Sequence, residues 1–93
     1  MMAFYTRARQ EHWLHDKDDE GRVVILEDES VWEIHPSDRL KVAHWLRIST
    51  ITVEHTQTKD YPYLLTNRTE SETARANYLG EVRSRMLIPP EVA

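Results

Sequence analysis

The stretch "DKDDEGRVVILE", residues 16–27, carries acidic side chains at a spacing that could bind calcium. It matches the calcium-loop template D-x-[DN]-x-[DN]-G-x5-E at four positions, Asp16, Asp18, Gly21 and Glu27. Such a loop takes oxygen ligands from its first, third and fifth positions and two oxygens from a glutamate at the twelfth. Here the fifth position is Glu20, which is one methylene longer than the usual residue, and the ninth is Val24, which has no side-chain oxygen.

The residues that follow Glu27 also argue against calcium binding. In a helix–loop–helix calcium unit they would begin a helix, whereas here they form a polar quartet and then an apolar run that contains Trp32. The sequence contains no second loop of this kind. We therefore interpret residues 16–27 as an acidic turn followed by a strand, and we expect no metal ion there.

Histidines are the second set of residues with metal chemistry. His12 and His15 would share one face of a helix, and Asp18 or Asp19 could then complete a transition-metal site. The sequence indicates neither a further ligand nor groups that would orient the imidazoles. We expect both histidines to be exposed on a loose segment.

The sequence contains no recognisable catalytic motif. His35, His44 and His55 fall in different predicted elements, and no serine–histidine–aspartate ordering is present. With two glycines, the chain has no glycine-rich loop for a phosphate. The sequence therefore predicts a protein that is not an enzyme and that uses no cofactor.

Aromatic residues are the stronger candidates for binding. Trp32 and Trp45 are expected in the core, because large rings dominate the packing of small domains. If one sheet face is open, tyrosines beside arginines would form a stacking surface for a peptide or single-stranded nucleic acid. The predicted binding residues are Tyr61, Tyr63, Arg68 and Arg75.

The elements that must position these residues are short strands. "RVVILEDESVWEI" predicts a hairpin, with Trp32 and Ile34 on one face of its second strand. "HPSDRLKVAHWLRIS" predicts a short helix that Ser37 caps. The buried side of that helix is expected to comprise Leu40, Ala43 and either Trp45 or Leu46.

Three more strands are predicted after the helix. "ITVEH" and "YPYLLTN" alternate in polarity and are separated by a turn. "TARANYL" alternates as well, which favours a strand, although Thr69 and Glu72 also fit a helix capping box. Before the hairpin, "FYTRARQEHWLH", residues 4–15, predicts a short helix or an ordered arm with Tyr5, Ala8 and His12 along one side.

Together these elements predict a mainly β fold. We expect a small five-stranded barrel or half-open antiparallel sheet, with one short helix between the second and third strands. The barrel domain is assigned to residues 21–80, an N-terminal arm or short helix to residues 1–20, and a C-terminal tail to residues 81–93. "LEDESVWEI", followed by "W", "ITVE" and "YPYLLTN", resembles small bacterial β-domain proteins of unknown function with SH3-like or OB-like barrels.

Composition narrows the classes of function. The 93 residues are 40% hydrophobic and 30% charged, contain no cysteine and include no run long enough to span a membrane, so a cytoplasmic protein is expected. The net charge is −4, and residues 11–20 alone carry five acidic residues and one lysine, which is also −4. This distribution lacks the basic surface of a duplex nucleic-acid binder.

Two functions fit these observations. The favoured hypothesis is a non-catalytic protein-interaction module or accessory subunit, whose partner is another protein and not a membrane. The alternative is RNA or single-stranded nucleic-acid binding on a small barrel. It would use four cations, Arg39, Lys41, Arg47 and Arg68.

Overall fold

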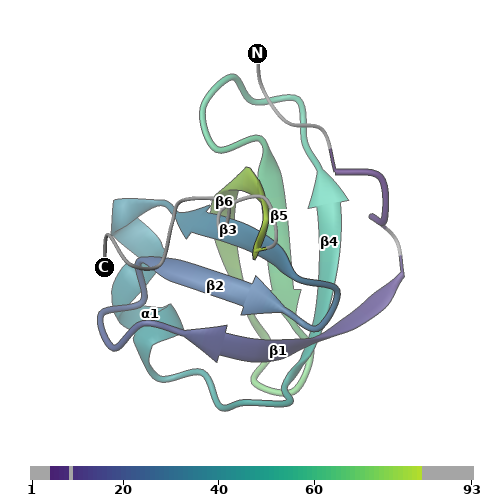
Figure 1. The fold of residues 1–93 in the computed structure, drawn as a ribbon. Coiled ribbons are helices and arrows are strands. Elements are labelled where there is room, and N and C mark those ends of the chain that lie inside the picture. Colours follow the sequence, from purple (N-terminus) through teal and green to yellow (C-terminus); the bar gives the residue numbers. More distant parts are fainter. Residues whose placement is uncertain (1–4, 9, 83–93) are drawn as a thin grey trace, which may run out of the picture.

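Six antiparallel strands form a closed barrel in the computed structural model, which describes residues 5–8 and 10–82 (Figure 1). In chain order the strands are β1 (Glu11–Lys17), β2 (Val23–Leu26), β3 (Ser30–Ile34), β4 (Thr50–His55), β5 (Tyr63–Asn67) and β6 (Glu72–Glu81). A 3-10 helix, η1 (Pro36–Asp38), leads into the helix α1 (Arg39–Ala43) between β3 and β4. Around the barrel the order is β1-β2-β3-β6-β5-β4, and β4 pairs with β1. The mainly β fold with one short helix is confirmed, with six strands in place of five.

The additional strand is β1, where a helix or an arm was expected. His12 and Leu14 are buried, whereas Glu11, Trp13 and His15 are exposed, which is the period-two alternation of a half-buried strand. β1 pairs with β2 on one side and with β4 on the other, so it closes the barrel. The prediction of a helix over residues 4–15 was therefore wrong for residues 11–15, and residues 4 and 9 lie outside the described residues. The barrel begins inside the segment that was assigned to the arm.

The hairpin of β2 and β3 was predicted correctly. Val24 pairs with Trp32, and the side chains of Trp32 and Ile34 are fully buried. Trp32 packs against three tyrosines in the core cluster. The ring centroids of Tyr5, Tyr63 and Tyr78 lie 4.8, 5.2 and 5.0 Å from that of Trp32. Tyr5, from the segment before β1, thus contributes to the core.

The helical segment forms as expected but with a different cap and a different buried face. Nδ1 of His35, and not the hydroxyl of Ser37, accepts a hydrogen bond at the start of η1, from the backbone N–H of Ser37 at 3.0 Å. Val42 and Trp45 are buried, whereas Leu40 is 80% exposed and Leu46 65% exposed. The single turn of α1 is too short to present the wide apolar stripe that the sequence pattern assumed.

Gly21 joins the acidic turn to α1. Its φ is +71°, which favours glycine, and a Cβ at this position would lie 2.7 Å from the backbone nitrogen of Ala43 and closer still to the carbonyl oxygen of Arg39. The turn between β1 and β2 therefore packs directly on the helix backbone.

β6 is a strand, as favoured, and the alternative helix is excluded. Ala74 and Ala76 face the core, opposite Leu65 and Tyr63 of β5. The predicted C-terminal tail lies outside the described residues from residue 83 onward. Within the described part of the chain, no helix has the length and apolar character needed to cross a membrane.

Candidate functional site

The acidic stretch at residues 16–27 contains the end of β1, a turn and the strand β2, so the predicted turn and strand are confirmed. The Asp18 carboxylate accepts hydrogen bonds from the backbone N–H groups of Arg22 and Val23, at 2.6 and 3.2 Å, and from Nε of Arg22 at 2.8 Å. Asp16 lies on β1 and pairs with Arg47 at 3.1 Å. These carboxylates hold the turn and its neighbours together, and do not converge on a common point.

A polar cluster lies between the segment before β1 and the turn between β2 and β3. His12 is 2% exposed, so the expectation of an exposed histidine was wrong for it. Nδ1 of His12 lies 2.9 Å from the Glu27 carboxylate, and Nε2 lies 2.9 Å from the Tyr5 hydroxyl and 3.0 Å from the carbonyl oxygen of Arg7. His15 is exposed, because residues three apart on a strand face opposite sides.

The partners of His12 determine its protonation state. A carboxylate and a backbone carbonyl only accept hydrogen bonds, so Nδ1 must donate to Glu27 and Nε2 must donate to Arg7. The Tyr5 hydroxyl donates to Asp28 at 2.5 Å, so it too acts as an acceptor toward His12. We therefore assign His12 as an imidazolium. Burial lowers the pKa of His12, but the Arg7 carbonyl and the carboxylates of Glu27 and Asp28 raise it above its ordinary value overall.

Asp28 is the centre of the same cluster. Its carboxylate accepts hydrogen bonds from Nε of Arg7 at 2.8 Å and from the hydroxyl of Ser30 at 2.6 Å, in addition to Tyr5. Burial alone would raise the pKa of Asp28, but these donors lower it to about 2. The Ser30 hydroxyl in turn accepts from the indole of Trp32 at 2.8 Å, so the polar cluster is anchored in the core.

The cluster also contains a set of atoms with metal-ligand chemistry. Nδ1 of His12 and one carboxylate oxygen each of Glu27 and Asp28 all lie within 4.8 Å of one another. A cation there would compete with the guanidinium of Arg7 for Asp28 and with the imidazolium proton for Glu27. Arg7 and His12 already pair with these carboxylates, and Nη2 of Arg7 also pairs with Glu81 at 2.7 Å, so the arrangement is an ion-pair network more than a metal site.

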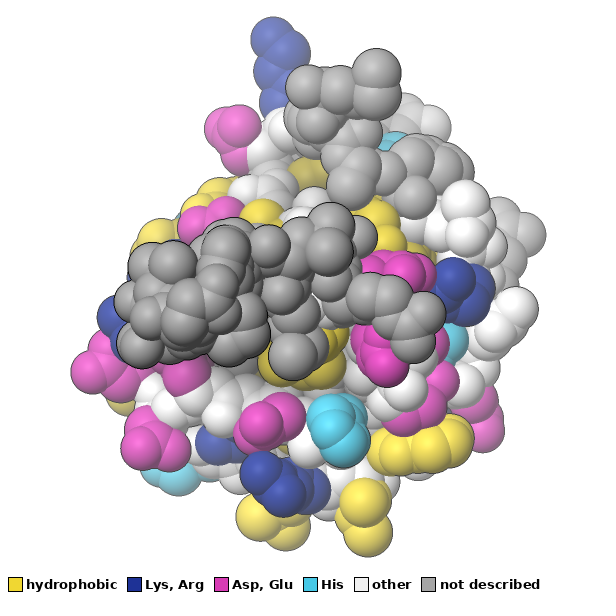
Figure 2. Space-filling view, in the orientation of Figure 1, with side chains coloured by type: hydrophobic (Ala, Val, Ile, Leu, Met, Phe, Trp, Pro, Cys, Tyr) yellow, Lys and Arg dark blue, Asp and Glu magenta, His cyan; other side chains and the backbone are white. Residues whose placement is uncertain are grey.

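An exposed groove adjoins this cluster on the outside of the barrel. It has a volume of about 350 Å³ and is lined by Glu11, His12, Trp13, Ile48 and Thr50, a set that we call the Trp13 groove. Trp13 is 50% exposed and Ile48 is 79% exposed. Hydrophobic side chains reach the surface in Figure 2 along the edge where β1 and the loop before β4 lie, beside acidic side chains.

The backbone presents both apolar residues of the groove rigidly. The Trp13 N–H donates to the Glu27 carboxylate at 2.9 Å, and its carbonyl accepts from the Glu27 N–H at 3.0 Å. Ile48 has a φ of +61°, a conformation that costs free energy in a β-branched residue. A hydrogen bond of 2.9 Å from its N–H to the carbonyl of Leu14 holds this strained, outward-facing position.

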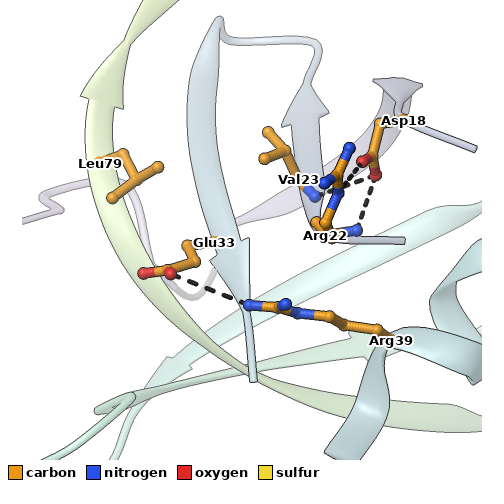
Figure 3. Close-up of a pocket in the computed structure, with 6 residues that line it drawn as sticks. All are labelled: Asp18, Arg22, Val23, Glu33, Arg39 and Leu79. Carbon is orange, nitrogen blue, oxygen red and sulfur yellow. Dashed lines mark hydrogen bonds and ion pairs between the residues drawn. The ribbon is translucent and has the colours of Figure 1, made fainter. Parts of the chain in front are cut away.

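A second hollow lies outside β2, β3 and β6, next to α1. It has a volume of about 660 Å³ and is lined by Asp18, Arg22, Val23, Glu33, Arg39 and Leu79 (Figure 3). Its cations are engaged: Arg22 pairs with Asp18 at 2.8 Å, and Nε of Arg39 donates to the carbonyl of Ile34 at 2.8 Å. A charged ligand would have to displace these partners, so this hollow is a weaker candidate for a binding site than the Trp13 groove.

The four residues predicted to bind a ligand do not form one surface. Tyr63 is 3% exposed and belongs to the core, where its hydroxyl accepts a hydrogen bond from the N–H of Tyr5. Arg75 pairs with Asp38 at 3.0 Å, and the ring of Tyr61 packs on that of His35. Arg68 is exposed beyond the opposite end of β5.

Sequence reasoning missed the Trp13 groove because β1 was not recognised as a strand. The period-two pattern of Glu11, His12, Trp13 and Leu14 was the available signal, and it places a tryptophan and a glutamate on the outer face. The outward position of Ile48 depends on the loop conformation, and no comparable pattern in the sequence predicts it.

No protein-family model matches the sequence, and comparison with curated proteins and with solved structures gives no significant match.

Proposed function

We propose that this protein is a non-catalytic interaction module that docks a protein partner at the Trp13 groove. The observation that carries the proposal is the exposure of Trp13 and Ile48 beside each other on the outer face of the barrel, on backbone that hydrogen bonds hold in place. Tryptophan is enriched among residues that dominate binding free energy, and backbone that is fixed before binding loses little entropy.

The closed sheet restricts how a partner can dock. Each of the six strands pairs with two neighbours around the closed barrel, so none of them is an edge strand within the described residues. The proposed docking therefore uses side-chain contacts on the outer face and not the addition of a peptide strand. The Trp13 groove offers such contacts, with apolar walls and the backbone of β1 fixed beneath them.

Most of the lysine and arginine side chains named for nucleic-acid binding already have partners within the protein, which favours a protein partner over a nucleic acid. Of the four residues named for nucleic-acid binding, Lys41 and Arg47 pair with carboxylates at 3.4 and 3.1 Å, and Arg39 is held by the carbonyl of Ile34 and by Glu33. Only Arg68 of that set makes no ion pair among the described residues. Phosphate binding needs several free cations on one face.

The proposal includes the absence of catalysis, because the environment of His12 prevents this residue from acting as a general base. Both of its ring nitrogens are engaged as donors, and its charge is balanced by the partly buried carboxylates of Glu27 and Asp28. A general base needs a free, basic nitrogen that faces substrate. His12 supports the structure of the groove wall and is not a proton acceptor for a ligand.

The test compares what three immobilised proteins retain from a lysate of the source cells: the wild type, Trp13→Ser and Leu40→Ser. Leu40 is the matched control, because it is 80% exposed but does not line the groove. We expect a protein that the wild type and the Leu40 variant retain and that the Trp13 variant loses. The same dependence must then hold with that partner purified. Identical retention by all three proteins would contradict docking at the groove.

A further inference from the structure

The geometry points to a specific ligand chemistry for the Trp13 groove: a lysine or arginine side chain carried by a partner segment with apolar neighbours. This inference rests on the proposed function and specifies it. Nothing in the docking proposal itself requires the partner to be cationic.

The groove combines an aromatic ring with an unpaired carboxylate. Glu11 and Trp13 both point outward from β1, about 7 Å apart along the strand, because alternate residues of a strand share a face. The Glu11 side chain is exposed and makes no hydrogen bond or ion pair among the described residues. A cation between them would meet the ring of Trp13 and the carboxylate of Glu11 together, and tryptophan is the best of the aromatic residues for such contacts.

The charges around the groove are complementary to a cation. Among the residues that the structure describes, no lysine or arginine lines it, and the positive charge of His12 is directed inward at Glu27. Within this described lining, the carboxylate of Glu11 is the uncompensated charge. Over a longer range, residues 11–20 carry a net charge of −4, which attracts a basic segment at low ionic strength.

The remaining walls suit the hydrocarbon part of the same side chain. Ile48 and Thr50 supply methyl groups opposite Trp13, and the methylene stems of lysine and arginine pack on apolar surface while their charged ends stay hydrated. The volume of about 350 Å³ accommodates one long side chain and an apolar neighbour.

The test uses two peptides that differ only in charge, acetyl-Leu-Arg-Leu-amide and acetyl-Leu-Gln-Leu-amide, added to the ¹⁵N-labelled full chain. We expect saturable shifts of the Trp13 indole N–H and the Ile48 and Thr50 amides with the arginine peptide. The glutamine peptide should bind about tenfold more weakly or not at all. Glu11→Gln should remove this preference, whereas Glu54→Gln, which neutralises an exposed acid outside the groove, should retain it.

Each other outcome overturns the inference. Equal binding of the two peptides at the groove would refute a cation preference but would leave groove docking intact. No shift at the groove with either peptide at several millimolar would refute the peptide-side-chain ligand, and the lysate comparison would still decide the docking proposal separately. An undiminished preference for the arginine peptide in Glu11→Gln would show that the Glu11 carboxylate does not bind the cation.

Discussion

Nδ1 of His12 lies 2.9 Å from one carboxylate oxygen of Glu27. The other oxygen of that carboxylate accepts a hydrogen bond of 2.9 Å from the backbone N–H of Trp13. One side chain in the turn after β2 thus fixes two successive residues of β1, of which the first faces inward and the second outward. The buried ion-pair network and the exposed Trp13 groove are therefore mechanically connected through Glu27.

The charge on His12 predicts how stability depends on pH. Its pKa in the folded protein is above the ordinary value of 6.5, so its contribution is fully present below about pH 6.5 and is lost as pH rises through the folded-state pKa. The free energy of unfolding by urea should fall between pH 6 and pH 9 in the wild type, and His12→Gln should lack this component. The same pH dependence in both proteins would refute the imidazolium assignment.

Asp28 predicts a loss of stability in acid. Its pKa is about 2 in the folded protein and 3.8 ordinarily, so its contribution is present above pH 3.8 and is lost as pH falls toward 2. The shift corresponds to roughly 2 kcal/mol. Acid titration followed by circular dichroism should show wild-type unfolding that is steeper in this range than that of Asp28→Asn. Parallel titration curves would exclude this role for Asp28.

Gly21 and Gly80 provide a matched pair of substitutions. Both have positive φ, but a Cβ at Gly21 would meet the backbone of α1, whereas one at Gly80 has open space around it. Gly21→Ala should cost about 2–4 kcal/mol of unfolding free energy, from backbone strain and overpacking together. Gly80→Ala should cost about 1–2 kcal/mol from strain alone. Equal costs in thermal or urea unfolding would argue against direct packing of the turn on α1.

Deletion of residues 1–19 should abolish the cooperative fold. The deletion removes β1, leaves β2 and β4 with unpaired edges, and takes Tyr5 and Leu14 out of the core. Burial of such side chains contributes about 1.5–3 kcal/mol each, which is a large part of the stability of a small domain. We expect a molten or aggregated product, whereas Trp13→Ser in the full chain should melt cooperatively. A truncated chain with dispersed amide resonances would show that the barrel does not need β1.

The sequence pattern predicted the elements whose alternation is regular and local. In the hairpin, Trp32 and Ile34 are buried on either side of the partly exposed Glu33, and in β6 Ala74 and Ala76 are buried on either side of the exposed Arg75, so both strands formed as expected. β1 was obscured because the spacing of Tyr5, Ala8 and His12 also fits a helix. Burial of a charged pair, such as His12 with Glu27, depends on partners that are brought together only by the fold.

The candidate site could be predicted only in part for the same reason. Tyr63 was expected in a binding surface because an open sheet face would have placed it beside Arg68 or Arg75, but its face of β5 points into the barrel. Conversely, the exposure of Leu46 and Ile48 follows from the loop after α1, where hydrogen bonds from Ile48 and Ser49 fix the backbone. The helix pattern predicted burial of either Trp45 or Leu46, of which Trp45 is buried, and it made no prediction for Ile48.

The indole N–H resonances of the three tryptophans test docking at the groove most directly. Trp13 is half exposed, whereas Trp32 and Trp45 are buried and serve as internal controls in the same molecule. When a concentrated lysate of the source cells is added to the ¹⁵N-labelled protein, the Trp13 signal should shift or broaden selectively. The amide of Leu40 should change no more than the signals of the buried tryptophans. An unchanged Trp13 signal, or equal attenuation of all three indoles, would contradict the proposal that the Trp13 groove is the docking surface.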